Sequence, residues 1–253
     1  EEAANAVKLT PAQDILLAGF TASRSFPVTT GAYQEDYGGG GYDAFVAHLR
    51  PEPGLSFEQQ LVYSSFLGGS GDESTADSAV ESYFGLRLLN GGLALDPNGT
   101  VLLTGSTSSS NFPTTLNAYD ATPTGTREVY LTRLRLDPAQ EQLLYSTVLG
   151  GGSNEAAFAL ALTSGGGVWL TGYTWSADFP TTPGAFNRSH SGRLADGFLA
   201  LLKPEAGPES QSQLVYSTFF GGLEWESGTA LAVRDDGLVT IGGWTWSRNF
   251  PTA

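Results

Sequence analysis

The stretch Gly172-Tyr173-Thr174-Trp175-Ser176-Ala177-Asp178-Phe179-Pro180 decides the fold, because its skeleton, Gly-x-Thr-x-Ser-x-x-Phe-Pro, occurs four times in the chain. The other copies begin at Gly19, Gly105 and Gly243. Self-similarity at a regular spacing is the signature of a repeat architecture. The chain is therefore expected to consist of repeated structural units.

Each copy of the motif is expected to end a β-hairpin. A run of β-favouring residues precedes the motif in every unit, and another apolar residue lies six positions before each run. The turns between them include Asp96-Pro97-Asn98-Gly99 and Ser164-Gly165-Gly166-Gly167, where residues that tolerate positive φ are needed. The predicted second strands begin with the residues 15–18, 101–104, 168–171 and 239–242.

Two further strands are predicted after the Phe-Pro dipeptide in the first three units. The third strands are expected at 43–49, 128–134 and 196–202, and the fourth strands at 61–69, 144–151 and 214–222. Four strands per unit is the size of one β-propeller blade. The predicted fold class is all-β, a β-propeller of four-stranded antiparallel blades. About three and a half blades lie in this chain, which is expected to be part of a larger propeller.

The whole chain, 1–253, is predicted to be one β-propeller domain or a partial propeller. The units span approximately 5–69, 92–151, 159–222 and 230–253, with an insertion at 70–91 in the connection between the first two. Within the insertion, apolar residues recur every fourth position, which predicts a short amphipathic helix. These residues are Ala76, Val80, Phe84 and Leu88.

Composition excludes several classes of function. The net charge of −14 disfavours binding to nucleic acids and to anionic membrane surfaces. The chain has no cysteine, so it has neither disulfides nor a thiolate metal site. It contains no run of about 18 apolar residues, so direct membrane insertion is not expected. It also contains no nucleophile elbow, phosphate-binding glycine motif or histidine-rich metal motif, so we expect no enzymatic activity.

Three segments together resemble the bacterial SBBP repeat, a family named for its proposed seven-bladed β-propeller. They are Val215-Tyr216-Ser217-Thr218-Phe219-Phe220-Gly221-Gly222, the residues 174–183 and the residues 43–49. The resemblance covers nearly the whole chain, and the combined motif is specific. It implies a propeller in an exported or cell-surface bacterial protein, often a large multidomain one. The family has no common catalytic residues to carry over.

Large aromatic side chains at the variable positions of the motif are the candidate ligand-binding residues. They are Tyr173, Trp175, Trp244 and Trp246, and the second unit has serines at these positions. If exposed, such rings stack on sugars or anchor a protein partner. The alternative is that they fill the space between adjacent blades.

Acidic residues after each Gly-Gly pair form the second candidate site. Glu73, Glu155 and Glu226 occupy equivalent positions, and Asp72 precedes the first of them. Carboxylates are the oxygen ligands that Ca²⁺ prefers. The alternative is that each glutamate accepts hydrogen bonds from backbone amides of the neighbouring blade; no other cofactor is expected. A further acidic set opens the third strands and is expected to cap turns or to bond the Thr and Ser of the motif: Asp43, Glu128 and Asp196.

The fourth unit has the sequence of the first two strands only, so its sheet edge is expected to be open. Folded proteins rarely leave such an edge uncovered. We therefore expect further strands of a longer chain, or a protein partner, to complete this blade. The expected function is a structural and binding scaffold, secreted or on a bacterial cell surface, in an extracellular assembly or in adhesion. Two alternatives stay open: a carbohydrate-binding or carbohydrate-active propeller with a surface glycan as its partner, and a filament subunit completed by a neighbouring chain.

Overall fold

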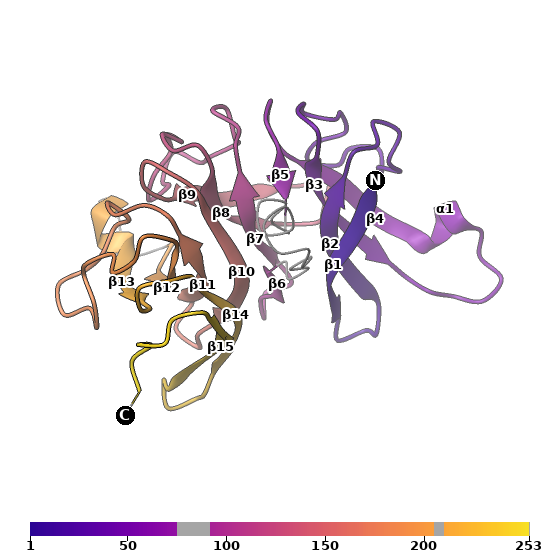
Figure 1. Ribbon diagram of the computed structural model, residues 1–253. Helices are drawn as coiled ribbons and strands as arrows, with labels where there is room; N and C mark the ends of the chain where they lie inside the picture. The colour runs from indigo at the N-terminus through magenta and orange to yellow at the C-terminus, as the bar shows by residue number, and fades with distance from the viewer. Residues whose placement is uncertain (75–91, 205–209, 253) are drawn as a thin grey trace.

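The computed structural model describes residues 1–74, 92–204 and 210–252, and in these ranges the chain is all-β (Figure 1). The first sheet has four antiparallel strands in the order of the sequence. Its strands are β1 (Glu2–Leu9), β2 (Ile15–Thr21), β3 (Asp43–Leu49) and β4 (Leu61–Leu67), with a four-residue helix, α1 (Phe57–Gln60), before β4.

The next two sheets repeat this order, and the fourth sheet has two strands within the described residues. These sheets confirm the all-β class and the antiparallel order of the unit. The second sheet contains β5 (Glu73–Ser74), β6 (Gly92–Leu95), β7 (Val101–Thr107), β8 (Glu128–Leu134) and β9 (Leu143–Leu149). The third contains β10 (Glu155–Leu162), β11 (Val168–Thr174), β12 (Asp196–Leu202) and β13 (Leu214–Phe220), with a short 3₁₀ turn, η1 (Ser210–Gln213), before β13; the fourth contains β14 (Glu226–Val233) and β15 (Val239–Thr245).

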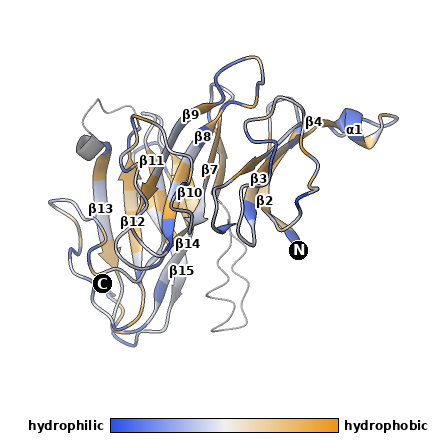
Figure 2. Ribbon diagram, turned by 90° about the horizontal axis from the view of Figure 1, so that it is seen from above, coloured by the Kyte–Doolittle hydropathy of each residue, from blue (hydrophilic) through white to orange (hydrophobic). Residues whose placement is uncertain are grey.

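Consecutive sheets pack face to face, and their first strands are in contact, β1 with β6, β6 with β10 and β10 with β14. Apolar side chains of one sheet pack against those of the next. Figure 2 shows the hydrophobic residues, in orange, along the strands of these sheets. Between the first two sheets, for example, Val46 and Tyr63 share a buried cluster with Leu103 and Tyr130. Each sheet is therefore stabilised by its neighbours, as in other repeat proteins.

The turn between the first two strands has the predicted geometry. Gly99, Gly166 and Gly237 adopt φ values of 80°, 77° and 85° in the three later units. In the first unit the equivalent turn places Gln13 at φ 68°. The prediction that these turns need residues tolerant of positive φ is therefore confirmed.

A β-bulge in the first strand explains the glycine that opens every copy of the motif. In β10 the pairing with β11 shifts between Ala157 and Ala159. The backbone of β10 consequently comes so close to Gly172 that a Cβ there would lie 1.8 Å from the carbonyl oxygen of Ala156. A Cβ at Gly243 would lie 2.1 Å from a carbonyl oxygen of β14 in the same way. Only glycine fits at these positions.

The insertion interrupts a strand, which differs from the prediction. β5 and β6 both pair with β7, in place of the one continuous first strand of the other sheets. The prediction that the insertion lies in a connection before the first strand is therefore wrong. The extra residues enter where the first strands of the other sheets have their bulge, a place where a strand tolerates insertion. The predicted helix at 76–88 lies outside the described residues. No helix in the described ranges is long and apolar enough to cross a membrane.

Candidate functional site

The motif's Thr and Ser bind the glutamate that begins the first strand of the same sheet. The Thr107 hydroxyl donates to Oε1 of Glu73 at 2.6 Å, and the Ser109 hydroxyl donates to the same oxygen. The other carboxylate oxygen accepts the N–H of Gly69, in the preceding unit, at 2.8 Å. The glutamate thus joins consecutive sheets. Thr174 and Ser176 bind Glu155 at 2.8 and 2.5 Å, and Thr245 binds Glu226 at 2.6 Å.

A second buried carboxylate faces each of these junctions. Asp43 accepts the N–H of Gly38 at 2.5 Å, so it caps its loop as predicted, but it does not bind the Thr and Ser of the motif. Its other oxygen, Oδ1, is buried and has no hydrogen-bond partner among the described residues. A Cβ built on Gly68 would lie 2.9 Å from this oxygen and 2.5 Å from Oε2 of Glu73. The two carboxyl groups therefore lie side by side. Equivalent pairs are Glu128 with Glu155 and Asp196 with Glu226.

Burial controls the charge of these pairs. Removal from water raises the pKa of Asp43 to about 6, with repulsion from Asp72 adding to it. It also raises the pKa of Glu73 to about 7, with repulsion from Asp43. Burial also raises the pKa values of Glu155 and Asp196, and repulsion from Glu128 and Glu226 adds a smaller effect in the same direction. The pair of Asp43 and Glu73 is therefore suited to hold a proton near neutral pH.

The acidic residues do not converge on one site. Glu73, Glu155 and Glu226 lie at three different sheet junctions, each occupied by protein donors. Asp72 accepts the N–H of Gly41 at 2.6 Å. In the part of the chain that the structure describes, no group of three or more His, Cys, Asp or Glu is arranged to hold a metal ion. The prediction of a Ca²⁺ site thus rests on the sequence alone.

Three of the four candidate aromatic residues pack between the third and fourth sheets. Tyr173 is fully buried, and Trp175 and Trp244 are partly buried in the same cluster. At its centre lies Trp225, 2% exposed, with its ring 5.9, 5.1 and 5.8 Å from the rings of Tyr173, Trp175 and Trp244. Trp246 is 52% exposed. The alternative that such rings fill inter-sheet space therefore describes all but Trp246.

Sequence reasoning missed Trp225, although a signal was present. Trp225 stands where the other units have Asp72 and Asn154. A large aromatic residue at a position that is otherwise polar indicates a local change of packing, and here the Trp225 ring packs on Tyr173, Trp175 and Trp244.

The face of the third sheet that points toward the fourth sheet is less covered than the equivalent faces of the first two sheets, which pack against the next sheet. Four positions show this, one each on the second and third strands and two on the fourth strand. In the first two sheets the side chains there are buried, whereas in the third sheet they are partly exposed. The equivalent sets are Leu16, Val46, Tyr63 and Leu67; Leu102, Leu131, Tyr145 and Leu149; and Trp169, Leu199, Tyr216 and Phe220.

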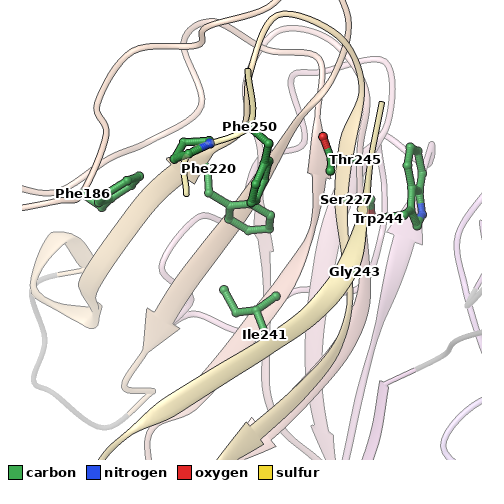
Figure 3. A pocket seen from close by; sticks show the side chains of 9 residues that line it. Phe186, Phe220, Ser227, Ile241, Gly243, Trp244, Thr245 and Phe250 are labelled. Carbon is green, nitrogen blue, oxygen red and sulfur yellow. The ribbon is translucent and has the colours of Figure 1, made fainter. Parts of the chain in front are cut away.

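An apolar pocket of about 460 Å³ lies where this face meets the fourth sheet. Phe186 and Phe220 of the third unit line it on one side, and Ile241, Gly243 and Phe250 line it on the other (Figure 3). β15 pairs with β14 and with no other strand in the described ranges. The pocket therefore adjoins an open sheet edge. The sequence predicts one of the pocket residues, Trp244, as a candidate ligand-binding residue. It does not single out Phe250, whose equivalents Phe112 and Phe179 are buried in the second and third units.

No protein-family model and no curated protein matches this chain. The resemblance to the SBBP repeat therefore stays a prediction.

Proposed function

We propose that the chain is a binding scaffold of the β-propeller type whose two-stranded fourth sheet accepts strands from a protein partner. The observation that carries the proposal is the apolar pocket beside the open edge of β15. The other three sheets each carry two more strands in the equivalent place.

Two kinds of interaction support strand addition at this edge. In the described ranges no strand pairs with the side of β15 directed away from β14, so a partner strand can add a ladder of backbone hydrogen bonds there, which gives affinity. The pocket takes side chains from alternate positions of the added strand, which gives specificity. Exposed apolar surface of this kind marks an interaction site.

The three complete sheets supply the rigidity that such a scaffold needs. The glutamates that bind the motif hydroxyls also accept an N–H from the preceding unit, so each sheet is joined to the one before it, including the fourth. A preformed edge reduces the entropy lost when a partner binds. We further propose a secreted or cell-surface setting on a bacterium, in an assembly or in adhesion, which the SBBP resemblance supports.

The carbohydrate alternative has less support. A sugar platform needs exposed rings, and among the four candidate residues only Trp246 is largely exposed.

A synthetic hairpin tests the proposal. We would titrate the protein with a peptide of its own residues 128–149, which contain β8 and β9, and measure binding by calorimetry. The expected result is one peptide bound per chain. Ile241→Lys, which places a charge in the pocket, is expected to abolish binding. The matched control Leu238→Ser, at a residue that is 52% exposed and does not line the pocket, is expected to leave binding unchanged. Equal binding to both variants, or none to the native chain, would refute the proposal.

A further inference from the structure

An aromatic ring packs beside the motif in each complete sheet. The glycine that opens the motif pairs with an aromatic residue at the third position of the next strand, as Gly105 pairs with Tyr130 and Gly172 with Phe198. That ring also packs on the Phe of Phe-Pro, with centroids 4.9 Å apart for Phe112 and Tyr130. The corresponding distances in the third and first sheets are 4.8 Å for Phe179 and Phe198 and 4.5 Å for Phe26 and Phe45.

The fourth unit has two of the three residues of this arrangement, the glycine that opens the motif and the Phe of Phe-Pro. Gly243 and Phe250 are the equivalents of Gly172 and Phe179, and both line the pocket. No strand of the described chain lies beyond β15 to bring a ring to Gly243. The pocket therefore has the position and the lining that receive an aromatic side chain in the other sheets.

A glutamine bridge joins the fourth strands of consecutive sheets. Gln142 stands directly before β9; its Oε1 accepts the hydroxyl of Tyr63 in β4 at 2.5 Å, and its Nε2 donates to the carbonyl of Gly31 at 2.8 Å. The next junction repeats both bonds. There Gln213 accepts from Tyr145 at 2.7 Å and donates to the carbonyl of Asn117 at 2.8 Å.

Tyr216 of β13 is the next tyrosine in this series. Its hydroxyl accepts the N–H of Phe186 at 3.2 Å, as Tyr63 accepts the N–H of Tyr33 at 3.0 Å. In the described ranges no acceptor receives the hydroxyl proton of Tyr216, and the side chain is partly exposed. Tyr216 thus presents a hydrogen-bond donor where its two equivalents bind a glutamine.

From these two features we infer the identity of the partner strands, an inference that rests on the proposed function. The partner is a separate polypeptide with a β-hairpin of the same repeat type. Its first strand pairs with β15 and carries an aromatic residue at the third position, which enters the pocket between Gly243 and Phe250. Its second strand is preceded by a glutamine, whose side-chain oxygen accepts the hydroxyl of Tyr216.

The 128–149 peptide contains both features, as Tyr130 and Gln142. Peptide variants Tyr130→Ala and Gln142→Leu therefore test them separately. Loss of the buried ring is expected to weaken binding by about 30-fold. Loss of the glutamine is expected to weaken it by about fivefold, as for one hydrogen bond.

A double-mutant cycle with the protein variant Tyr216→Phe identifies the glutamine's partner. This variant removes only a hydroxyl from a partly exposed ring, and circular dichroism checks its fold. With Tyr216→Phe, the native and Gln142→Leu peptides are expected to bind alike. If the peptide binds but Tyr130→Ala and Gln142→Leu bind as well as the native peptide, the inference is wrong while the proposed function survives. If no peptide binds, the proposed function fails.

A fusion distinguishes a separate partner from a tethered one. The same range, 128–149, is attached after Ala253 through a glycine-serine linker, and protection of β15 amides is compared with that given by the free peptide. Protection by the free peptide supports a separate partner. Protection only in the fusion overturns it.

Discussion

Replacing Asp43 with asparagine tests the buried carboxyl pair at the first sheet junction. The folded-state pKa values of Asp43 and Glu73, about 6 and about 7, lie above their ordinary values of 3.8 and 4.5. The folded protein therefore binds protons more tightly than the unfolded chain. The resulting stabilisation is complete below about pH 4 and is lost as the pH rises through 6 and 7. We expect the protein to be more stable at pH 5 than at pH 8.

The magnitude follows from the pKa shifts. One pKa unit corresponds to about 1.4 kcal/mol. The two carboxyls share one junction, and partial solvent screening reduces the effect, so we expect this pair to contribute a difference on the order of 2 kcal/mol between pH 5 and pH 8. The asparagine side chain of the variant is neutral at every pH, so it removes the repulsion that Asp43 exerts on Glu73. Asp43→Asn is therefore expected to stabilise the protein at pH 8 by about 1–2 kcal/mol and to leave it nearly unchanged at pH 5.

Urea unfolding of the native chain and of Asp43→Asn at both pH values measures these differences. Asp236→Asn is the matched control, because Asp236 is exposed and pairs with Arg234 at the surface. The control is expected to behave as the native chain does. If Asp43→Asn lowered the free energy of unfolding equally at pH 5 and pH 8, the account of a buried carboxyl pair with raised pKa values at this junction would be wrong.

Two further predictions concern packing. Trp225→Ala removes the centre of the aromatic cluster and is expected to lower the free energy of unfolding by about 3–5 kcal/mol. Replacing the exposed Trp246 with alanine is expected to change this free energy by about 0.5 kcal/mol or less. Similar shifts of the thermal unfolding midpoint for both variants would contradict the assignment of Trp225 to the core. Gly172→Ala places a methyl group 1.8 Å from a carbonyl oxygen and is expected to destabilise the protein by about 3 kcal/mol or more, whereas Gly165→Ala, with no atom within 4 Å, is expected to be nearly neutral. Equal denaturation midpoints for the two glycine variants would count against the bulge as the reason for the motif's glycine.

The strands could be predicted from the sequence where β-branched and aromatic residues repeat. The third strands begin and end at the predicted residues, as Asp43–Leu49 shows. The first strands begin earlier than predicted, at Glu155 rather than at 159 and at Glu226 rather than at 230. Their opening residues are mostly Glu, Ala, Ser and Gly, which have low β-propensity, and a bulge breaks the alternation. The hydrophobic pattern of the sequence alone therefore cannot locate where these first strands begin.

The candidate site was harder to predict, for two physical reasons. Whether Tyr173 is exposed depends on Trp225 of the next sheet, and the repeat alignment does not show that they touch. The pocket at Phe250 exists because this unit has two strands in the described ranges, whereas the same Phe is buried in the second and third units. The sequence could predict the open edge, but the pocket and the role of Tyr216 follow only from the three-dimensional arrangement.

Hydrogen exchange of the β15 amides tests the central claim most directly. The account predicts that, in the chain alone, the β15 amides directed away from β14 exchange fast, and that a saturating 128–149 peptide slows their exchange. Amides of β11, which is paired on both sides, are expected to be slow in both conditions. If the peptide binds and the β15 amides exchange as before, the partner does not add a strand to this edge, and the account of the open sheet is contradicted.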